Sequence, residues 1–128
     1  MAKKDASFVH LHTHTYKSIL DGTSPIAGLV EKAKANNMPG FAVTDHGNLY
    51  ALPELLKKQD SAKAAGVKMI MGCEFYMSED RTKKDKDQET YHITILAKDN
   101  KGLENISLLS TKSYTEGFIE NLELILIY

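Results

Sequence analysis

The 128-residue sequence has a single cysteine, no tryptophan and no long apolar run. Because Cys73 stands alone, a disulfide within the chain and a zinc-finger spacing are both excluded. The first residues, MAKKDASFVHLH, lack the apolar centre of a signal peptide. The most apolar stretch, LELILIY, is far shorter than the ~20 residues of a membrane span. These absences predict a cytoplasmic protein with no membrane association.

A strong charge of one sign is also missing, since 16 basic and 17 acidic residues leave a net charge of -1. Such a balance provides no overall field that would attract nucleic acid or an anionic membrane. Apolar residues, by contrast, make up 42% of the chain, which is enough for a packed core. We therefore expect one folded domain whose function depends on local groups.

Strand-like and helix-like patterns alternate along the chain. Strands are predicted over residues 7–15, 41–44, 67–77 and 91–98. Helices are predicted over about 25–36, 51–65 and 100–113, with Ser24 and Pro25 beginning the first and Gly66 ending the second. The polar segment 78–90 is expected to be a solvated loop. This order predicts an α/β fold with a mainly parallel sheet and flanking helices, whose functional groups collect at the carboxyl ends of the strands.

Three histidines occupy alternate positions in the stretch FVHLHTHT. Residues i and i+2 of an extended strand point to the same side, so His12 and His14 can aim their imidazoles at one point, with His10 behind them. Two imidazoles at this spacing are a chelating pair for zinc, manganese or iron. Taken alone, the pattern fits a pair of surface histidines on an edge strand equally well.

Further ligand-type residues follow at the other predicted strand ends. The pair Asp45-His46 ends the second strand, and Asp21 follows the first in the turn SILDG. Glu74 stands among apolar residues of the third strand, where an unpaired carboxylate would be costly. With the two histidines these residues predict a mixed imidazole–carboxylate set at one sheet edge, as in hydrolytic centres of divalent metals.

His92 fits this set least well, because it stands near the start of its predicted strand and a structural role explains it almost as well. No competing nucleophile is evident, since the sequence has no G-x-S-x-G elbow and Cys73 lies in an apolar strand. Phosphate-binding GxxxxGK[ST] and GxGxxG loops are absent as well. The metal site is therefore the leading hypothesis for chemistry.

Four sequence blocks resemble, in order, the PHP (polymerase and histidinol phosphatase) domain in the branch found in bacterial DNA polymerase III alpha subunits. The blocks are HLHTHT with its following S-x-LDG, AVTDHGNL, GVKMIMGCEFYM and YHITILAKDNKGLENISLLSTKSYTEGF. The resemblance covers residues 6–118 and leaves 119–128 as a divergent or truncated tail. It implies part of a distorted (β/α)7 barrel and a metal centre, zinc or manganese with up to three ions in complete members, that hydrolyses a phosphodiester or pyrophosphate.

By position, the resemblance implies metal ligands at His12, His14, Asp21, His46, Glu74 and His92. Of these, Glu74 and His46 are also expected to be catalytic. His10 and Asp45 are expected to stand behind the ligands and orient them. Tyr16 and Lys17 replace the acidic or amide residue and the aromatic residue usual in the family, which is expected to alter the rim of the metal centre. Whole PHP domains are about twice as long and carry later ligands that this sequence lacks.

The resemblance also implies partners. These are the remainder of the polymerase alpha subunit, in some bacteria the proofreading exonuclease subunit, and DNA only through the full-length protein. The chain alone is not expected to polymerise DNA. Two alternatives remain open: a catalytically silent structural or partner-binding domain, and an independent PHP-family phosphatase. Because part of a barrel exposes apolar faces and strand edges, self-association is expected too.

Overall fold

The computed structural model describes residues 8–78, 89–116, 118–119 and 122–123. The elements of this part of the chain are α1 (Ile26–Ala35), β1 (Gly40–Val43), α2 (Leu52–Ala64), β2 (Lys68–Met77), β3 (Tyr91–Leu96), α3 (Asn100–Glu116), β4 (Phe118–Ile119) and β5 (Leu122–Glu123). The three predicted helices and the last three predicted strands are confirmed, with ends within three residues of those expected. Most of the predicted loop 78–90 and of the predicted tail 119–128 lies outside the described residues.

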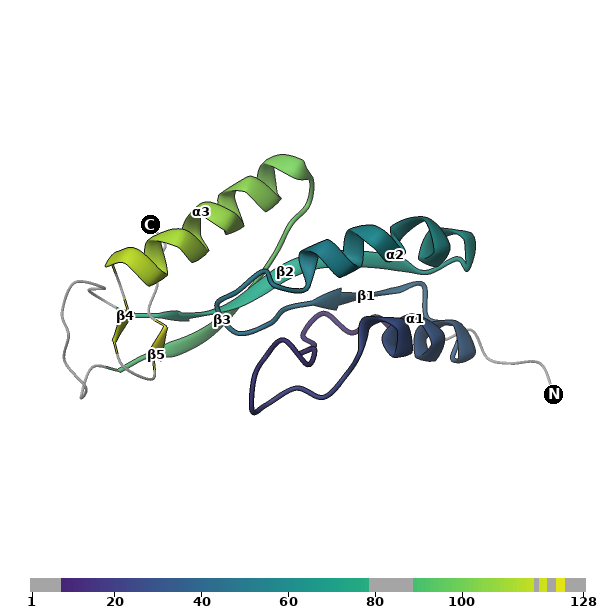
Figure 1. Cartoon of the computed structure of the whole chain (residues 1–128), viewed down its shortest axis with the longest axis horizontal. Helices are drawn as coiled ribbons and strands as arrows, with labels where there is room; N and C mark the ends of the chain where they lie inside the picture. Colours follow the sequence, from purple (N-terminus) through teal and green to yellow (C-terminus); the bar gives the residue numbers. More distant parts are fainter. Residues whose placement is uncertain (1–7, 79–88, 117, 120–121, 124–128) are drawn as a thin grey trace.

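The main sheet has the strand order β1-β2-β3 (Figure 1). β1 and β2 are parallel, with Gly40 opposite Lys68, whereas β2 and β3 are antiparallel, with Met77 opposite Tyr91. β4 and β5 form a separate antiparallel pair. Right-handed crossovers alone would make every strand parallel, so the antiparallel pairing of β2 with β3 departs from that prediction. It brings the start of β3 to the edge at which β2 ends.

The first predicted strand, residues 7–15, is not a regular strand in the structure. Its described part is an extended segment beside β1, joined to it by an isolated parallel bridge between His10 and Phe41. Thr44 N–H donates to Thr13 O at 2.9 Å, but Thr13 N–H donates to the side-chain Oγ1 of Thr44 at 2.8 Å. Because the Thr13 N–H bonds to a side chain and not to a backbone carbonyl, the ladder of backbone hydrogen bonds is interrupted here. The strand prediction is wrong for that reason.

The helix ends follow local hydrogen bonding. The prediction of Ser24 as the cap of α1 is wrong by one residue: Pro25 precedes the helix and no side chain caps it. Ser24 instead pairs with the segment before it, since Tyr16 N–H donates to Ser24 O at 3.1 Å. The prediction for α2 is confirmed, because Gly66 follows its end with φ +75, a conformation that favours glycine. At α3, Gly102 N–H donates to Asp99 Oδ1 at 2.8 Å, the usual geometry of a capping aspartate.

Two apolar clusters form the core on the helix side of the sheet. The larger lies between α1, β1 and α2 and contains Ile26, Ala33, Phe41, Val43, Ala51, Leu55 and Val67. The smaller lies between β2 and α3 and contains Cys73, Phe75 and Ile106. Cys73 is fully buried, in agreement with the prediction that it packs in the core. These clusters anchor the strands whose ends carry the polar residues discussed below.

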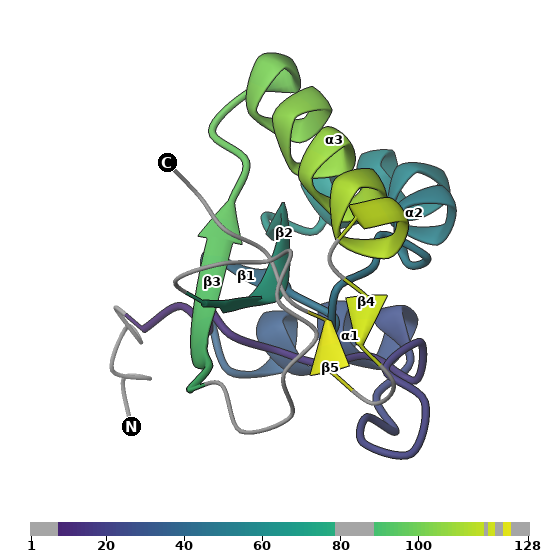
Figure 2. The same ribbon diagram turned by 90° about the vertical axis from the view of Figure 1, so that its left-hand side faces the viewer.

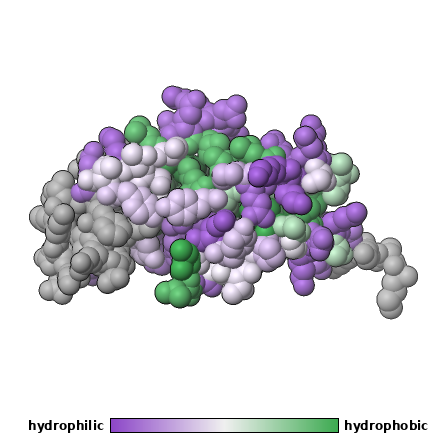
Figure 3. Space-filling view, in the orientation of Figure 1, coloured by the Kyte–Doolittle hydropathy of each residue, from purple (hydrophilic) through white to green (hydrophobic). Residues whose placement is uncertain are grey.

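Seen along the long axis, α3, α2 and α1 form an arc around one side of the sheet (Figure 2). This is the arrangement of part of a β/α barrel, so the predicted fold class is confirmed. Apolar surface gathers over α2 and α3 (Figure 3), where a hollow is lined by Leu52, Leu55, Leu56, Met69 and Leu103 among others. None of the predicted site residues lines this hollow. Among the described helices, none combines the length and apolar character required to cross a membrane.

Candidate metal centre

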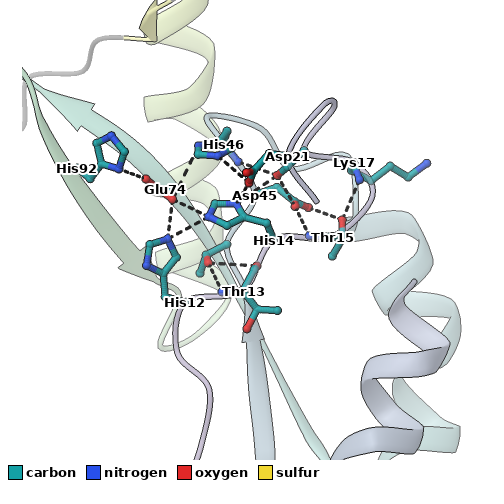
Figure 4. A network of polar contacts seen from close by, with 12 residues as sticks. His12, Thr13, His14, Thr15, Lys17, Asp21, Asp45, His46, Glu74 and His92 are labelled. Carbon is teal, nitrogen blue, oxygen red and sulfur yellow. Dashed lines mark hydrogen bonds and ion pairs between the residues drawn. The ribbon is translucent and has the colours of Figure 1, made fainter. Parts of the chain in front are cut away.

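The predicted ligands meet at one edge of the sheet because the strand pairing continues past β1. Glu74 N–H donates to Asp45 O at 3.0 Å, and Gly47 N–H donates to Glu74 O at 2.8 Å. These two bonds form a parallel bridge between His46 and Glu74. The extended segment before α1 passes the same edge and adds His12 and His14 (Figure 4). Residues separated by up to 62 positions therefore lie in contact.

One ligand-type group is formed by His12, His14 and Glu74. Glu74 Oε2 lies 2.6 Å from His12 Nε2 and 2.9 Å from His14 Nε2. The two imidazole nitrogens are 3.1 Å apart. Alternate positions in an extended segment thus direct both rings to one carboxylate oxygen, as the spacing predicts.

A second ligand-type group is formed by Asp21, His46 and again His14. Asp21 Oδ2 lies 3.2 Å from His46 Nε2 and 3.9 Å from His14 Nδ1. The rings of His14 and His46 are stacked, with centroids 4.2 Å apart. The turn that returns Asp21 to this edge is tight: a Cβ on Gly22 would overlap the carbonyl oxygen of Thr15. Position 22 therefore has to be glycine, because the backbone of Thr15 comes too close to leave room for a side chain.

His92 joins the cluster from β3. Its Nδ1 lies 2.5 Å from Glu74 Oε1, although its side chain is 57% exposed. The two atoms are close, but their orientation is not that of a hydrogen bond, and Glu74 Oε1 has no hydrogen-bond partner among the described residues. Sequence reasoning placed His92 last because it assumed that the start of a strand lies away from the carboxyl edge. The antiparallel direction of β3 removes that objection.

The two residues predicted to stand behind the ligands have different surroundings. His10 is exposed and packs edge-on against Phe8, with ring centroids 4.8 Å apart, and it is absent from both ligand-type groups. Asp45 is buried, and its carboxylate accepts hydrogen bonds from Thr15 N–H at 2.6 Å, Thr15 Oγ1 at 2.8 Å and Ser18 Oγ at 2.7 Å. The Asp45 side chain therefore holds the loop that carries the predicted ligands His14 and Asp21.

Sequence reasoning did not single out Ser18 or Thr15 as contributors to the site. Both are buried, and Ser18 contacts both His14 and His46. A signal was present, because a serine three positions before Asp21 belongs to the HTHT–S–LDG block. Tyr16 donates to Glu54 Oε2 of α2 at 2.6 Å, and Lys17 Nζ lies 4.6 Å from the centre of the Tyr16 ring.

The electrostatic environment favours the metal-binding forms of two residues. Burial by itself would raise the pKa of Glu74, which is 1% exposed, but the His12 hydrogen bond and the nearby charges of His46, His12 and His14 outweigh it and lower that pKa. Burial, together with the charge of His46, lowers the pKa of His14 despite the opposing effect of Glu74 and Asp21. An ionised carboxylate and a neutral imidazole are the forms that bind a cation.

The donor set fits a divalent cation. Nitrogen atoms of two imidazoles and an oxygen atom of a carboxylate lie within 3.1 Å of one another, with Asp21 and His46 beside them. Two buried atoms, His46 Nδ1 and Glu74 Oε1, have no hydrogen-bond partner among the described residues. Buried polar atoms are costly when unpaired, and a bound ion is one of the partners that removes that cost. Mixed nitrogen and oxygen ligands suit zinc, manganese or iron rather than calcium.

Comparison with known proteins identifies relatives among DNA polymerase III alpha subunits. The DNA polymerase III alpha subunit of Borreliella burgdorferi is 41% identical over 115 residues, which are 87% of this chain and 10% of that protein. The alpha subunits of Aquifex aeolicus and Thermus aquaticus are each 42% identical over 120 residues, covering 87% and 88% of this chain and 10% of each relative. This chain thus spans about a tenth of the length of the curated relatives that it matches.

A solved structure shares the fold. An amidohydrolase from Chromobacterium violaceum, determined with bound sulfate and no metal, matches with a TM-score of 0.54 and 23% identity over 84% of this chain and 34% of that one. The family model described as the PHP domain matches residues 10–125, a range that includes every residue of both ligand-type groups. This chain therefore belongs to the PHP domain family.

Proposed function

We propose that this chain carries a metal-dependent phosphoesterase site that hydrolyses a phosphodiester or pyrophosphate. The observation that supports it most directly is the convergence of His12 Nε2, His14 Nε2 and Glu74 Oε2 within 3.1 Å of one another. Neutral imidazole and carboxylate ligands at the carboxyl edge of an α/β sheet are the usual basis of metal-assisted hydrolysis.

In this proposal the residues divide into two sets. His12, His14 and Glu74 hold one ion, and Asp21 and His46, with His14 shared between the sets, hold a second. His92 faces the other oxygen of Glu74, so that this carboxylate is placed to bridge ions. When bound, zinc or manganese would polarise the phosphoryl oxygens and activate water.

Glu74 and His46 are the residues that we propose as catalytic. Each offers one atom to a ligand-type group, through Glu74 Oε2 and His46 Nε2. Each also keeps a second polar atom, Glu74 Oε1 and His46 Nδ1, without a hydrogen bond among the described residues. Glu74 Oε1 lies 2.5 Å from His92 Nδ1, and His46 Nδ1 lies 3.8 Å from Glu74 Oε2, so each of these second atoms faces another residue of the proposed centre. The buried position of Glu74 holds its carboxylate in one orientation.

Metal analysis and a chromogenic phosphodiester assay test this proposal. The chain, purified without chelator, is expected to retain zinc or manganese and to hydrolyse bis(p-nitrophenyl) phosphate when either metal is added. His12→Ala and Glu74→Ala should abolish hydrolysis, whereas His10→Ala, outside both ligand-type groups, should not. Failure to bind metal, together with no hydrolysis, would refute the enzymatic proposal. Activity that survives both ligand substitutions would show that another site is responsible.

The relatives supply the biological setting of the proposal. We propose that the chain acts as a part of a replicative DNA polymerase III alpha subunit in the cytoplasm, because the relatives described above bear that name. Contact with DNA would then come through the whole subunit, and the chain alone would not polymerise DNA. These relatives give less support to an independent phosphatase.

A second candidate function is structural, as a docking domain for the proofreading exonuclease subunit. The observation that favours it is the apolar hollow between α2 and α3, which lies apart from the ligand-type groups and has the exposed Leu56 at its edge. Exposed apolar surface of this kind marks interaction sites. This role is supported if the exonuclease binds and if Leu56→Glu weakens that binding while Glu74→Ala leaves it unchanged. If the exonuclease does not bind the full-length subunit, the role is excluded. Sedimentation without the partner would also detect the expected self-association of the chain.

A further inference from the structure

Ser18 lies between the two ligand-type groups, and the proposed chemistry gives it no role. It lies in the loop between His14 and Asp21 and is 2% exposed. Its hydroxyl oxygen contacts three groups: Asp45 Oδ1 at 2.7 Å, His46 N at 3.2 Å and His14 Nδ1 at 3.3 Å. A serine hydroxyl can donate one hydrogen bond and accept two, so these contacts fill its capacity.

The direction of each hydrogen bond can be assigned. Asp45 Oδ1 also receives the backbone N–H of Thr15 at 2.6 Å, so this oxygen is an acceptor and Ser18 Oγ donates to it. The backbone N–H of His46 can only donate, and it uses one acceptor position of Ser18. The remaining contact, with His14 Nδ1, can be a hydrogen bond only if Nδ1 carries the proton.

We infer that Ser18, oriented by Asp45, is a positioning residue that fixes His14 as the Nδ1–H tautomer and leaves its Nε2 lone pair free to bind a cation. The tautomer of a neutral histidine is set by the hydrogen bonds of its two nitrogens. Nε2 of His14 is the atom that faces Glu74 Oε2, at 2.9 Å, and His12 Nε2, at 3.1 Å. This inference rests on the proposed metal site.

The assignment resolves an ambiguity in the ligand sets. His14 belongs to both ligand-type groups, through Nε2 toward Glu74 and through Nδ1 toward Asp21. With a proton on Nδ1, His14 can serve only the group of His12 and Glu74. The pair Asp21 and His46 then provides the ligands of this chain for the other ion.

The test begins with metal-free protein at mildly alkaline pH, labelled with ¹⁵N at histidine. Long-range ¹H–¹⁵N spectra distinguish the two tautomers directly and need no substitution. For wild type we expect a protonated Nδ1 and an unprotonated Nε2 at His14. Ser18→Ala should shift His14 toward the Nε2–H tautomer and weaken zinc binding about 10- to 100-fold, the usual cost of removing a group that orients a ligand. Ser18→Thr, which keeps the hydroxyl, should restore both properties.

Ser113→Ala is the matched control. Ser113 is a buried serine of α3 that donates to Ser110 O and lies outside both ligand-type groups. It should leave the tautomer and the zinc affinity unchanged. A wild-type His14 that carries its proton on Nε2 would overturn the inference, whether or not the variants fold. So would an unaltered His14 tautomer and zinc affinity in Ser18→Ala. A wild type that shows the expected tautomer but binds no zinc would instead refute the proposed function.

Discussion

His92 Nδ1 lies 2.5 Å from Glu74 Oε1 across the antiparallel pairing of β3 with β2. The register places His92 opposite Tyr76, two positions beyond Glu74 toward the end of β2. The same carboxylate faces His12 and His14 with its other oxygen. His46, from the segment after β1, adds its Nδ1 at 3.8 Å from Oε2, so histidines from three separate segments contact the Glu74 carboxylate.

Glu74→Gln should abolish high-affinity metal binding while the fold is retained. The substitution preserves shape but removes the negative charge that the histidines surround. Isothermal titration with zinc or manganese should show affinity reduced by at least about 100-fold, more than the loss typical of groups that only orient ligands. Glu104→Gln, an exposed carboxylate paired with Lys101, is the control and should bind as wild type. Equal affinities of the two variants would contradict the role of Glu74.

His92→Ala should weaken metal binding less than Glu74→Gln does. His92 faces only Oε1, and the group of His12, His14 and Oε2 remains complete without it. Metal content per chain, measured by mass spectrometry of the dialysed protein, should therefore fall without reaching zero. His10→Ala should leave the content unchanged, since His10 lies outside both ligand-type groups. An equal loss in the two histidine variants would count against the assignment of His92.

Asp45→Ala should destabilise the chain even when no metal is present. Its carboxylate accepts three hydrogen bonds from Thr15 and Ser18 in a buried setting. A buried donor without its acceptor costs about 1–3 kcal/mol, so the free energy of unfolding should fall by roughly 2–4 kcal/mol. Urea denaturation in the presence of chelator measures this change. Asp60→Ala, at an exposed position of α2, should change stability little; a similar loss there would show that the effect is not specific.

Acidification should destabilise the metal-free chain. The pKa values of His14 and Glu74 are lower in the fold than their ordinary values of 6.5 and 4.5. The unfolded chain therefore binds more protons than the folded chain below each ordinary value, and stability is lost as pH falls. The contribution of His14 should begin to disappear below about pH 6.5 and that of Glu74 below about pH 4.5. Denaturant titrations across this pH range, with chelator present, measure the free energy of unfolding. A rise of that free energy on acidification would contradict the expectation.

Gly22→Ala should disturb the proposed metal centre through the backbone. The added Cβ would overlap the carbonyl oxygen of Thr15, so the turn that carries Asp21 must move. We expect a loss of about 1–3 kcal/mol in stability, as for other overpacked positions, together with weaker binding of an ion at Asp21 and His46. Gly66→Ala is a suitable comparison, because its φ of +75 also makes alanine costly there but its Cβ would contact nothing. That variant should lose stability and retain metal binding.

The local sequence pattern was sufficient to predict the helices and the types of residue that form the two ligand-type groups. Apolar periodicity located α1, α2 and α3, because burying one face is what stabilises each of them. Alternate spacing in an extended segment was enough to predict that His12 and His14 point to one place. The same reasoning could not predict that residues 8–15 form an interrupted edge segment, because that depends on Thr44 supplying a side-chain acceptor.

The sequence by itself determined which side chains this chain can offer: a set of imidazoles and carboxylates suited to a metal, and one cysteine that packs inside. Only the tertiary structure decided how those groups meet. The direction of β3 brings His92 to Glu74, and the loop fold places Ser18 between His14 and His46. Strand direction and loop closure depend on contacts between residues far apart in the chain. Local propensity and spacing carry no information about such contacts.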